Sequence, residues 1–246
     1  MSHAVKEHDG PEVYWQYEDI DQQQETYVVG MWSFLVTEVM FFGALFLIYS
    51  LYRWKYHSDF FLAHEQLNWK MGGVNTMVLL FSSFTVALAV HFAQKGRVAL
   101  QQLCLFITVL CAFGFLVIKT FEYGAKIDHK LFPNHSFTWG HHEDEAHAEK
   151  SFWDEALPQV LHVEKKPQEG NPYRAKLFYS IYFTMTGLHG AHVVIGIIAI
   201  TSLMVLIKIR SPLITDYIPT ELVGLYWHFV DLVWIFLYPL YYLIPH

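Results

Sequence analysis

Several charged or titratable side chains lie inside runs of sequence that are otherwise apolar. Glu38 is the only acid in the stretch VVGMWSFLVTEVMFFGALFLIYS, residues 28–50. Three further cases are pairs spaced i,i+3, which places both side chains on one face of a helix. The pairs are Lys119 with Glu122, His189 with His192, and His228 with Asp231. An ionised group at the centre of a bilayer costs about 2.5 to 3.5 kcal/mol even on the mildest scale, so these residues are the functional candidates.

Such residues can either form hydrogen bonds between helices or act as ligands of a metal or haem. Interhelical hydrogen bonding explains each pair taken alone. A di-iron site needs Glu-x-x-His motifs, whereas this chain has His-x-x-His and His-x-x-Asp. A haem needs facing histidines, which His91, His189 and His228 supply in principle. Both cysteines, Cys104 and Cys111, lie in one apolar run and do not form a binuclear copper site. No ligand set is complete, so we predict no catalytic, cofactor or metal site in this chain.

Glu38 is expected to be a structural and proton-handling group. An acid in an apolar helix usually faces protein, pairs or stays neutral. We therefore expect Glu38 to be neutral and hydrogen-bonded to a polar residue of another helix. Such a carboxyl can exchange a proton when water approaches, but it cannot carry an electron.

The elements that must position these residues are membrane-spanning helices. The chain has 246 residues, of which 54% are hydrophobic and only 16% charged, and this is too apolar for an ordinary soluble domain. A helix of about 20 mainly apolar residues crosses the hydrocarbon layer. Five segments reach that length: residues 28–50, 75–94, 100–122, 177–207 and 222–244. The predicted fold class is an all-α membrane protein, a bundle of five transmembrane helices.

Orientation follows from the basic residues. The short connections QKGRV and KIRSPLITDYIPT are basic and fall on the same side as the N-terminus. Because basic residues in short loops dominate orientation, we expect a cytoplasmic N-terminus and a C-terminus outside. Residues 1–27 are predicted to be a polar, acidic N-terminal segment without a visible targeting peptide. Residues 28–246 are predicted to be a single five-helix domain.

Residues 123–176 are predicted to be a long polar loop within this domain. The segment contains six histidines and many acids, but HHEDEAH has no fixed ligand geometry for a metal. Its aromatic residues favour docking on another surface over a free loop. The net charge of −7 comes from this loop and the acidic N-terminus, so it does not indicate a nucleic-acid partner.

Five strings resemble the signature segments of subunit III of haem–copper cytochrome c oxidase. They are GMWSFLVTEVMFF, NTMVLLFSSFTVALA, KTFEYGAKI, TGLHGAHVVIG and YWHFVDLVWIFLYPL, in the family's order and across all five spans. The resemblance implies an accessory subunit of an aa3-type oxidase in aerobic respiratory electron transport, located in the bacterial plasma membrane. The family role is to support assembly, stability and proton uptake of the catalytic subunit. Haem and copper belong to partner subunits: this chain would bind subunit I, with subunit II in the complex.

The resemblance also implies roles for single residues. Glu38 matches the intramembrane acid that carbodiimides label in the family, and Glu122 matches the acid of the EY segment. The other embedded polar positions of the family match His189, His192, His228 and Asp231. Unlike the seven-helix form, this chain lacks two N-terminal helices that form a lipid cleft with the rest. The resemblance therefore leaves bound phospholipid open, and the His-rich loop has no counterpart in the family.

Two other functions remain open at this stage. The homologous accessory subunit of a quinol oxidase or nitric oxide reductase shares five helices and these motifs. A stand-alone proton-coupled transporter using Glu38 and Asp231 is the alternative from another class. The odd number of spans and the absence of paired broken helices in the sequence disfavour a transporter.

Overall fold

The computed structural model describes residues 15–65, 67–128, 130–133, 137, 139, 170–209 and 217–243. These residues form six helices and no strand. The helices are α1 (Ile20–Lys55), α2 (His57–His64), α3 (Trp69–Gln94), α4 (Val98–Asp128), α6 (Pro172–Lys208) and α7 (Ile218–Tyr242). All except the short α2 are long and apolar enough to cross a membrane. The prediction of an all-α chain with five membrane-spanning helices is therefore confirmed.

Polar residues at the helix ends explain why several helices begin where they do. The side chain of Asp19 accepts a hydrogen bond from the backbone N–H of Gln22 and caps α1. Asn68 caps α3, and Asn171 caps α6, whose first residue is Pro172. A carboxylate or amide oxygen here satisfies a backbone donor that has no partner within the helix.

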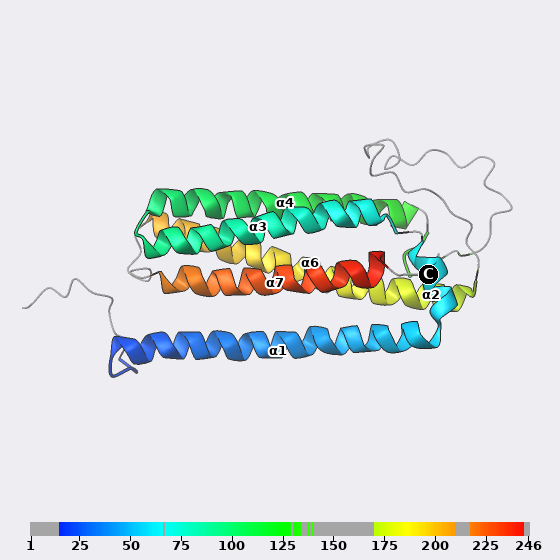
Figure 1. Ribbon diagram of the computed structural model, residues 1–246, viewed down its shortest axis with the longest axis horizontal. Helices are drawn as coiled ribbons and strands as arrows, with labels where there is room; N and C mark the ends of the chain where they lie inside the picture. The colour runs from blue at the N-terminus through cyan, green and yellow to red at the C-terminus, as the bar shows by residue number, and fades with distance from the viewer. Residues whose placement is uncertain are drawn as a thin grey trace, which may run out of the picture.

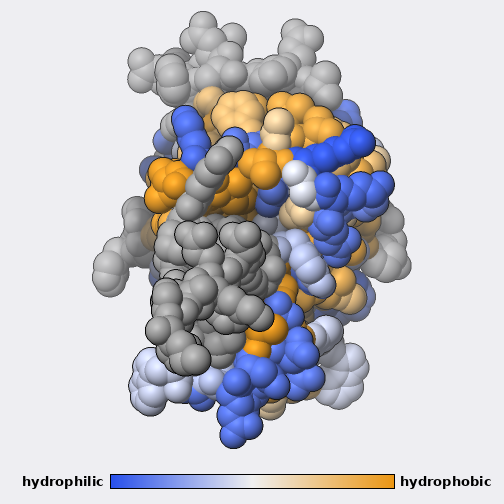
Figure 2. Space-filling view, turned by 90° about the vertical axis from the view of Figure 1, so that its left-hand side faces the viewer, coloured by the Kyte–Doolittle hydropathy of each residue, from blue (hydrophilic) through white to orange (hydrophobic). Residues whose placement is uncertain are grey.

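Helices α3, α4, α6 and α7 pack side by side as the core of the bundle, and α1 lies along one side (Figure 1). Helix α7 is the most buried, and its Trp227, Trp234 and Tyr241 are fully enclosed. Figure 2 shows hydrophilic side chains gathered on the end face where α1 begins, beside hydrophobic ones. The start of α1 and the end of α7 lie at opposite ends of the bundle, as an odd number of spans requires (Figure 1).

Helix α1 buries only a narrow stripe. Apart from Gln23 its buried residues are Leu35, Phe42 and Tyr49, spaced by seven. Two turns separate each from the next, so the stripe follows one face of the helix. Tyr49 fastens this face to the bundle, because its hydroxyl donates to the backbone oxygen of Leu240 at 2.7 Å. The remaining surface of α1 is apolar and exposed, including Val29, Trp32, Val36, Val39, Met40 and Leu47.

The helices extend beyond the predicted spans. Helix α1 begins at Ile20, inside the segment predicted to be a polar N-terminal extension. Residues 123–128 belong to α4 and residues 172–176 to α6, although both were predicted to be loop. Hydropathy marks the part of a helix that sits in hydrocarbon, whereas polar turns can continue it into water. Most of the predicted His-rich loop, and residues 1–14 of the N-terminal segment, lie outside the described residues.

Candidate functional site

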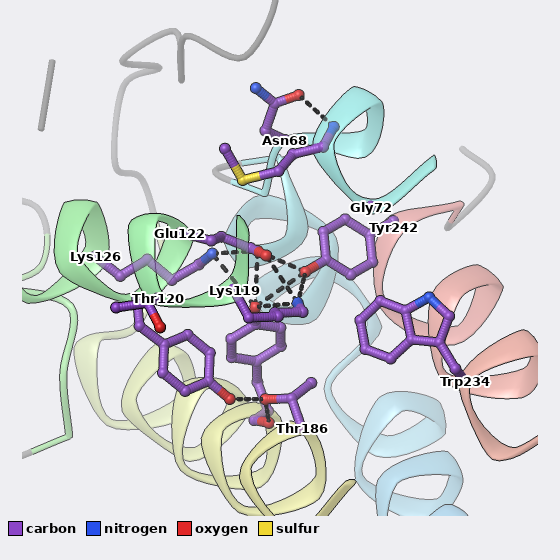
Figure 3. A network of polar contacts seen from close by, with 12 residues as sticks. Asn68, Gly72, Lys119, Thr120, Glu122, Lys126, Thr186, Trp234 and Tyr242 are labelled. Atoms are coloured by element: carbon purple, nitrogen blue, oxygen red, sulfur yellow. Dashed lines mark hydrogen bonds and ion pairs between the residues drawn. The ribbon is translucent and has the colours of Figure 1, made fainter. Parts of the chain in front are cut away.

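A cluster of ionic and phenolic groups surrounds Glu122 near the C-terminal end of α4 (Figure 3). One carboxylate oxygen of Glu122 accepts from Lys119 Nζ at 2.7 Å, and the other accepts from Lys126 Nζ at 2.6 Å. The hydroxyls of Tyr182 and Tyr242 donate to the same oxygen as Lys126, at 2.8 and 2.5 Å. We call these five residues the Glu122 cluster. It connects α4, α6 and α7 around a single carboxylate.

The Glu122 cluster is closed to solvent within the described residues. Only 1% of Glu122 is exposed, and both lysines are also buried. Lys119 Nζ lies 4.5 Å from the centre of the Trp234 ring, a distance at which a cation is attracted to the aromatic face. The two ammonium groups therefore share one carboxylate and are further stabilised by aromatic rings and hydroxyls. This arrangement can hold charge and lock three helices together.

A second polar contact joins α1 to α6. His192 Nε2 lies 3.2 Å from Glu38 Oε2, and His192 Nδ1 lies 2.8 Å from the backbone oxygen of Leu188. A carbonyl oxygen can only accept, so Nδ1 carries a hydrogen and Nε2 of the neutral ring is an acceptor. The contact with Glu38 then requires a proton between the carboxyl and the ring. We call these two residues the Glu38–His192 pair.

The Glu38–His192 pair is less enclosed than the Glu122 cluster. The side chains of Glu38 and His192 are 19% and 15% exposed. Phe42 packs edge-on to the imidazole at 5.2 Å, and Tyr226 donates to the backbone oxygen of His192. The pair thus holds one proton at the seam between α1 and the bundle, with part of its surface uncovered.

The residues His228 and Asp231 both bond across to α3. The His228 ring lies 2.6 Å from the hydroxyl of Ser83, and Ser82 donates to Asp231 at 3.4 Å. The indole N–H of Trp227 donates to Ser82 at 3.0 Å. This seam matches the interhelical bonding that the i,i+3 spacing suggested, although His228 and Asp231 bond to serines of α3 and not to each other.

His189 is placed differently from the other candidates. Its ring packs against Phe115 and Trp234, with centroids 5.5 and 5.1 Å away. No described residue hydrogen-bonds to either ring nitrogen. His91 is exposed on α3. Among the described residues no three His, Cys, Asp or Glu side chains converge as metal ligands, so the structure does not bring His91, His189 and His228 together as one site.

Asp59 forms a polar link outside the spans, between α2 and the start of α6. Its carboxylate accepts from Arg174 Nη1 at 2.8 Å and from the backbone N–H of Asn171 at 2.9 Å. Burial alone would raise the pKa of Asp59, but the hydrogen bonds from Arg174 and Asn171 and the charge of Arg174 outweigh it and lower that pKa. The guanidinium also lies over the ring of Tyr56, 4.6 Å from its centre. This link fixes the short helix that connects α1 to α3.

The sequence analysis missed three of the five members of the Glu122 cluster, namely Lys126, Tyr182 and Tyr242. The spacing of Lys119, Glu122 and Lys126 is i, i+3, i+7, a single helix face, and extending the search by one turn would have included Lys126. Nothing in the sequence marks Tyr182 or Tyr242 as partners, because each comes from another helix. Of the predicted pairs, only Lys119 with Glu122 is bonded internally.

Comparisons with known proteins point to one family. The family described as cytochrome c oxidase subunit III matches residues 173–245. A relative from Nocardia farcinica named probable cytochrome c oxidase subunit 3 is 29% identical over 85% of this chain and 84% of its own length. A probable quinol oxidase subunit 3 from Staphylococcus saprophyticus is 28% identical over 88% of both chains. Cytochrome c oxidase subunit 3 of Bacillus sp. strain PS3 is 26% identical over 87% of this chain and 84% of its own length.

Proposed function

Because the chain belongs to the subunit III family of haem–copper oxidases, we propose that it is the accessory, non-redox subunit of an aa3-type cytochrome c oxidase in aerobic respiration. As a member of this family it is an integral protein of the bacterial plasma membrane and part of a multi-subunit oxidase complex. Its proposed task is to support assembly, stability and proton uptake of the catalytic subunit. The Glu38–His192 pair is the observation that carries the proposal.

The pair has the properties that proton exchange requires. The hydrogen bond from His192 Nδ1 to Leu188 fixes the tautomer, so one proton lies between Glu38 and His192 Nε2. Both side chains are partly exposed, and a proton can therefore reach or leave them through water or a polar group of a neighbouring subunit. The chemistry is a proton transfer between carboxyl and imidazole, without any change of oxidation state.

The exposed face of α1 supports association with another membrane subunit. Only a narrow stripe of this helix packs on the bundle, and the rest is apolar. Lipid or the surface of catalytic subunit I, with subunit II in the complex, would cover this face. Haem and copper would reside in those partners, and bound phospholipid would fill gaps between the subunits. The basic turn at Lys95 and Arg97 supports a cytoplasmic N-terminus, on the same side of the membrane.

The proposal is tested by Glu38→Gln in the purified oxidase complex. Glutamine can still donate a hydrogen bond to His192 Nε2, so assembly should be retained, but it cannot ionise. We expect slower proton-coupled turnover or a shorter active life, with unchanged haem spectra. Glu25→Gln is the matched control, because Glu25 is an exposed acid of the same helix. The measurement is oxygen consumption and proton uptake over many turnovers, with the content of this subunit determined in each sample. Wild-type rates, lifetime and proton stoichiometry in Glu38→Gln would reduce Glu38 to a structural role.

A quinol oxidase is the second candidate. Relatives named quinol oxidase subunit 3 are about as similar to this chain as those named cytochrome c oxidase subunit 3. The electron donor is decided in a neighbouring subunit, so oxidation of cytochrome c and of quinol by the purified complex distinguishes the two. Turnover with quinol alone would favour the second candidate.

A further inference from the structure

Three buried polar residues in the core carry atoms without a hydrogen-bond partner among the described residues. These atoms are both ring nitrogens of His189, the side-chain amide nitrogen and oxygen of Asn75, and Oδ1 of Asp231. The exposed fractions of His189 and Asn75 are 1% and 0%. A polar group buried without a partner is costly, and membrane interiors offer no bulk water to compensate. Each of these atoms therefore calls for a ligand.

The packing of α3 against α4 sets the level of Asn75 in the bundle. The hydroxyls of Thr85 and Thr108 are 2.8 Å apart and fix the register of these two antiparallel helices. Along α3, Asn75 precedes Thr85 by the same number of residues by which Ile118 follows Thr108 along α4. Since both helices rise by the same amount per residue, Asn75 is level with the turn of α4 between Phe115 and Lys119.

The indole of Trp234 brings His189 to the same level. Its ring centre is 5.1 Å from the His189 ring and 4.9 Å from that of Phe115. Its N–H donates to the hydroxyl of Thr76, the neighbour of Asn75 in the chain, at 3.1 Å. His189 from α6 and Asn75 from α3 thus belong to one layer of the core around Trp234. Asp231 lies three residues before Trp234, about one turn nearer the start of α7.

The chemistry of these atoms favours water as the ligand. A neutral imidazole presents one donor and one acceptor, and an amide side chain presents both kinds as well. Water donates and accepts, carries no charge and is small enough for a closed site. Buried waters typically make about three hydrogen bonds to polar groups that have no other partner. A metal ion would need a converging set of ligands, which the described residues do not form.

We propose that the Trp234 layer is an internal hydration site, at which His189 and Asn75 bind at least one water molecule and Asp231 Oδ1 lies at its edge. The site adjoins the Glu122 cluster, because Lys119 Nζ lies 4.5 Å from the centre of the same indole ring (Figure 3). Water at this position satisfies buried donors and acceptors of α3 and α6 that do not reach each other. It acts as a structural link between these two helices.

The first test is a double-mutant cycle in the purified complex, with His189→Phe, Asn75→Leu and both together. Each single variant should lower the midpoint temperature of unfolding of this chain, because the remaining residue loses its shared water. The double variant should be a few degrees more stable than the sum of the two effects predicts. If the site holds no water, each substitution removes a buried polar group that has no partner, and the protein is not destabilised. Raised or unchanged unfolding midpoints in the single variants, with additive effects in the double variant, would therefore overturn the proposal.

His91→Phe provides the control cycle with Asn75→Leu. It makes the same change at an exposed histidine, and its effect should add to that of Asn75→Leu. If His189→Phe fails to assemble, the wild-type complex still decides the matter. An experimental density map that shows ordered waters should have one within hydrogen-bonding distance of a His189 ring nitrogen and the Asn75 amide. Direct bonds from both side chains to protein groups, or no density between them, would refute the site.

Discussion

Replacing Glu122 by glutamine should be the most damaging single change in the Glu122 cluster. Glutamine has nearly the same shape and can still accept from Tyr182 or Tyr242, but it has no charge. In the wild-type protein Lys119 and Lys126 each bond to a carboxylate oxygen of Glu122 within 2.7 Å. In Glu122→Gln two buried ammonium groups would face each other without a counter-ion.

The structure sets the size of this effect. Breaking a buried ion pair by removing one partner costs about 3 to 5 kcal/mol, because the other charge stays buried. Two like charges about 5 Å apart at an effective dielectric constant of about 20 repel by roughly 3 kcal/mol, which is a comparable amount. For a chain of this length each kcal/mol shifts the unfolding midpoint by about 2 to 4 °C, so we expect a loss of about 6 to 20 °C.

Lys119→Met provides the informative comparison. It leaves Glu122 paired with Lys126, a neutral combination, so its cost should be clearly smaller than that of Glu122→Gln. Both variants are compared with wild type by the temperature at which this chain unfolds in the purified complex. A Glu122→Gln midpoint within about 2 °C of wild type, or a larger loss in Lys119→Met, would refute this account of the cluster.

Two further predictions concern packing and pH. A Cβ atom at Gly196 would lie 2.6 Å from the buried Trp227 ring, so Gly196→Ala should destabilise by about 1 to 3 kcal/mol. Gly190→Ala on the same helix meets nothing within 4 Å and should be neutral in the same thermal assay; equal losses in both variants would contradict the packing argument. The pKa of Asp59 is lowered in the fold, so its contribution to stability is complete above its ordinary value of 3.8 and lost as pH falls through the lowered pKa. The midpoint difference between wild type and Asp59→Asn should therefore be largest at neutral pH and shrink below pH 4, and a difference independent of pH would exclude the carboxylate as its cause.

The number and type of the long helices could be predicted because the signal is local. A run of about 20 apolar residues is sufficient to indicate a span, whatever it packs against. The ends were less predictable, since the Asp19 cap and the polar first turns of α1 lie outside the apolar run. The short helix α2 has too few residues for any periodic pattern, and it depends on contacts with α6 such as the one between Asp59 and Arg174.

The candidate site was predicted residue by residue but not partner by partner. The sequence identifies Glu38, Glu122 and Asp231 as acids in apolar runs, because burying a charge is costly and such positions stand out. It does not identify His192 as the partner of Glu38, 154 positions along the chain, or the two tyrosines of the Glu122 cluster. Those contacts depend on the order and rotation of the helices, which hydropathy does not encode.

Glu122 and Glu38 differ in how fully their side chains are enclosed. Glu122 is enclosed by two ammonium groups and two hydroxyls. A change in its protonation would therefore require all five side chains of the Glu122 cluster to rearrange. Glu38 contacts His192 and remains partly exposed at a seam where α1 contacts the bundle through a narrow stripe. In the proposed function Glu38 exchanges protons, and such a group must change state at little cost and must reach a donor or acceptor. Of the two sites, the Glu38–His192 pair fits this proposed role better than the enclosed Glu122 cluster. The Glu122 cluster instead holds α4, α6 and α7 in place, and through α7 it keeps the Leu240 carbonyl in position for Tyr49 of α1. The Glu122 cluster thereby helps to fix the helices against which α1, and with it the Glu38–His192 pair, is positioned.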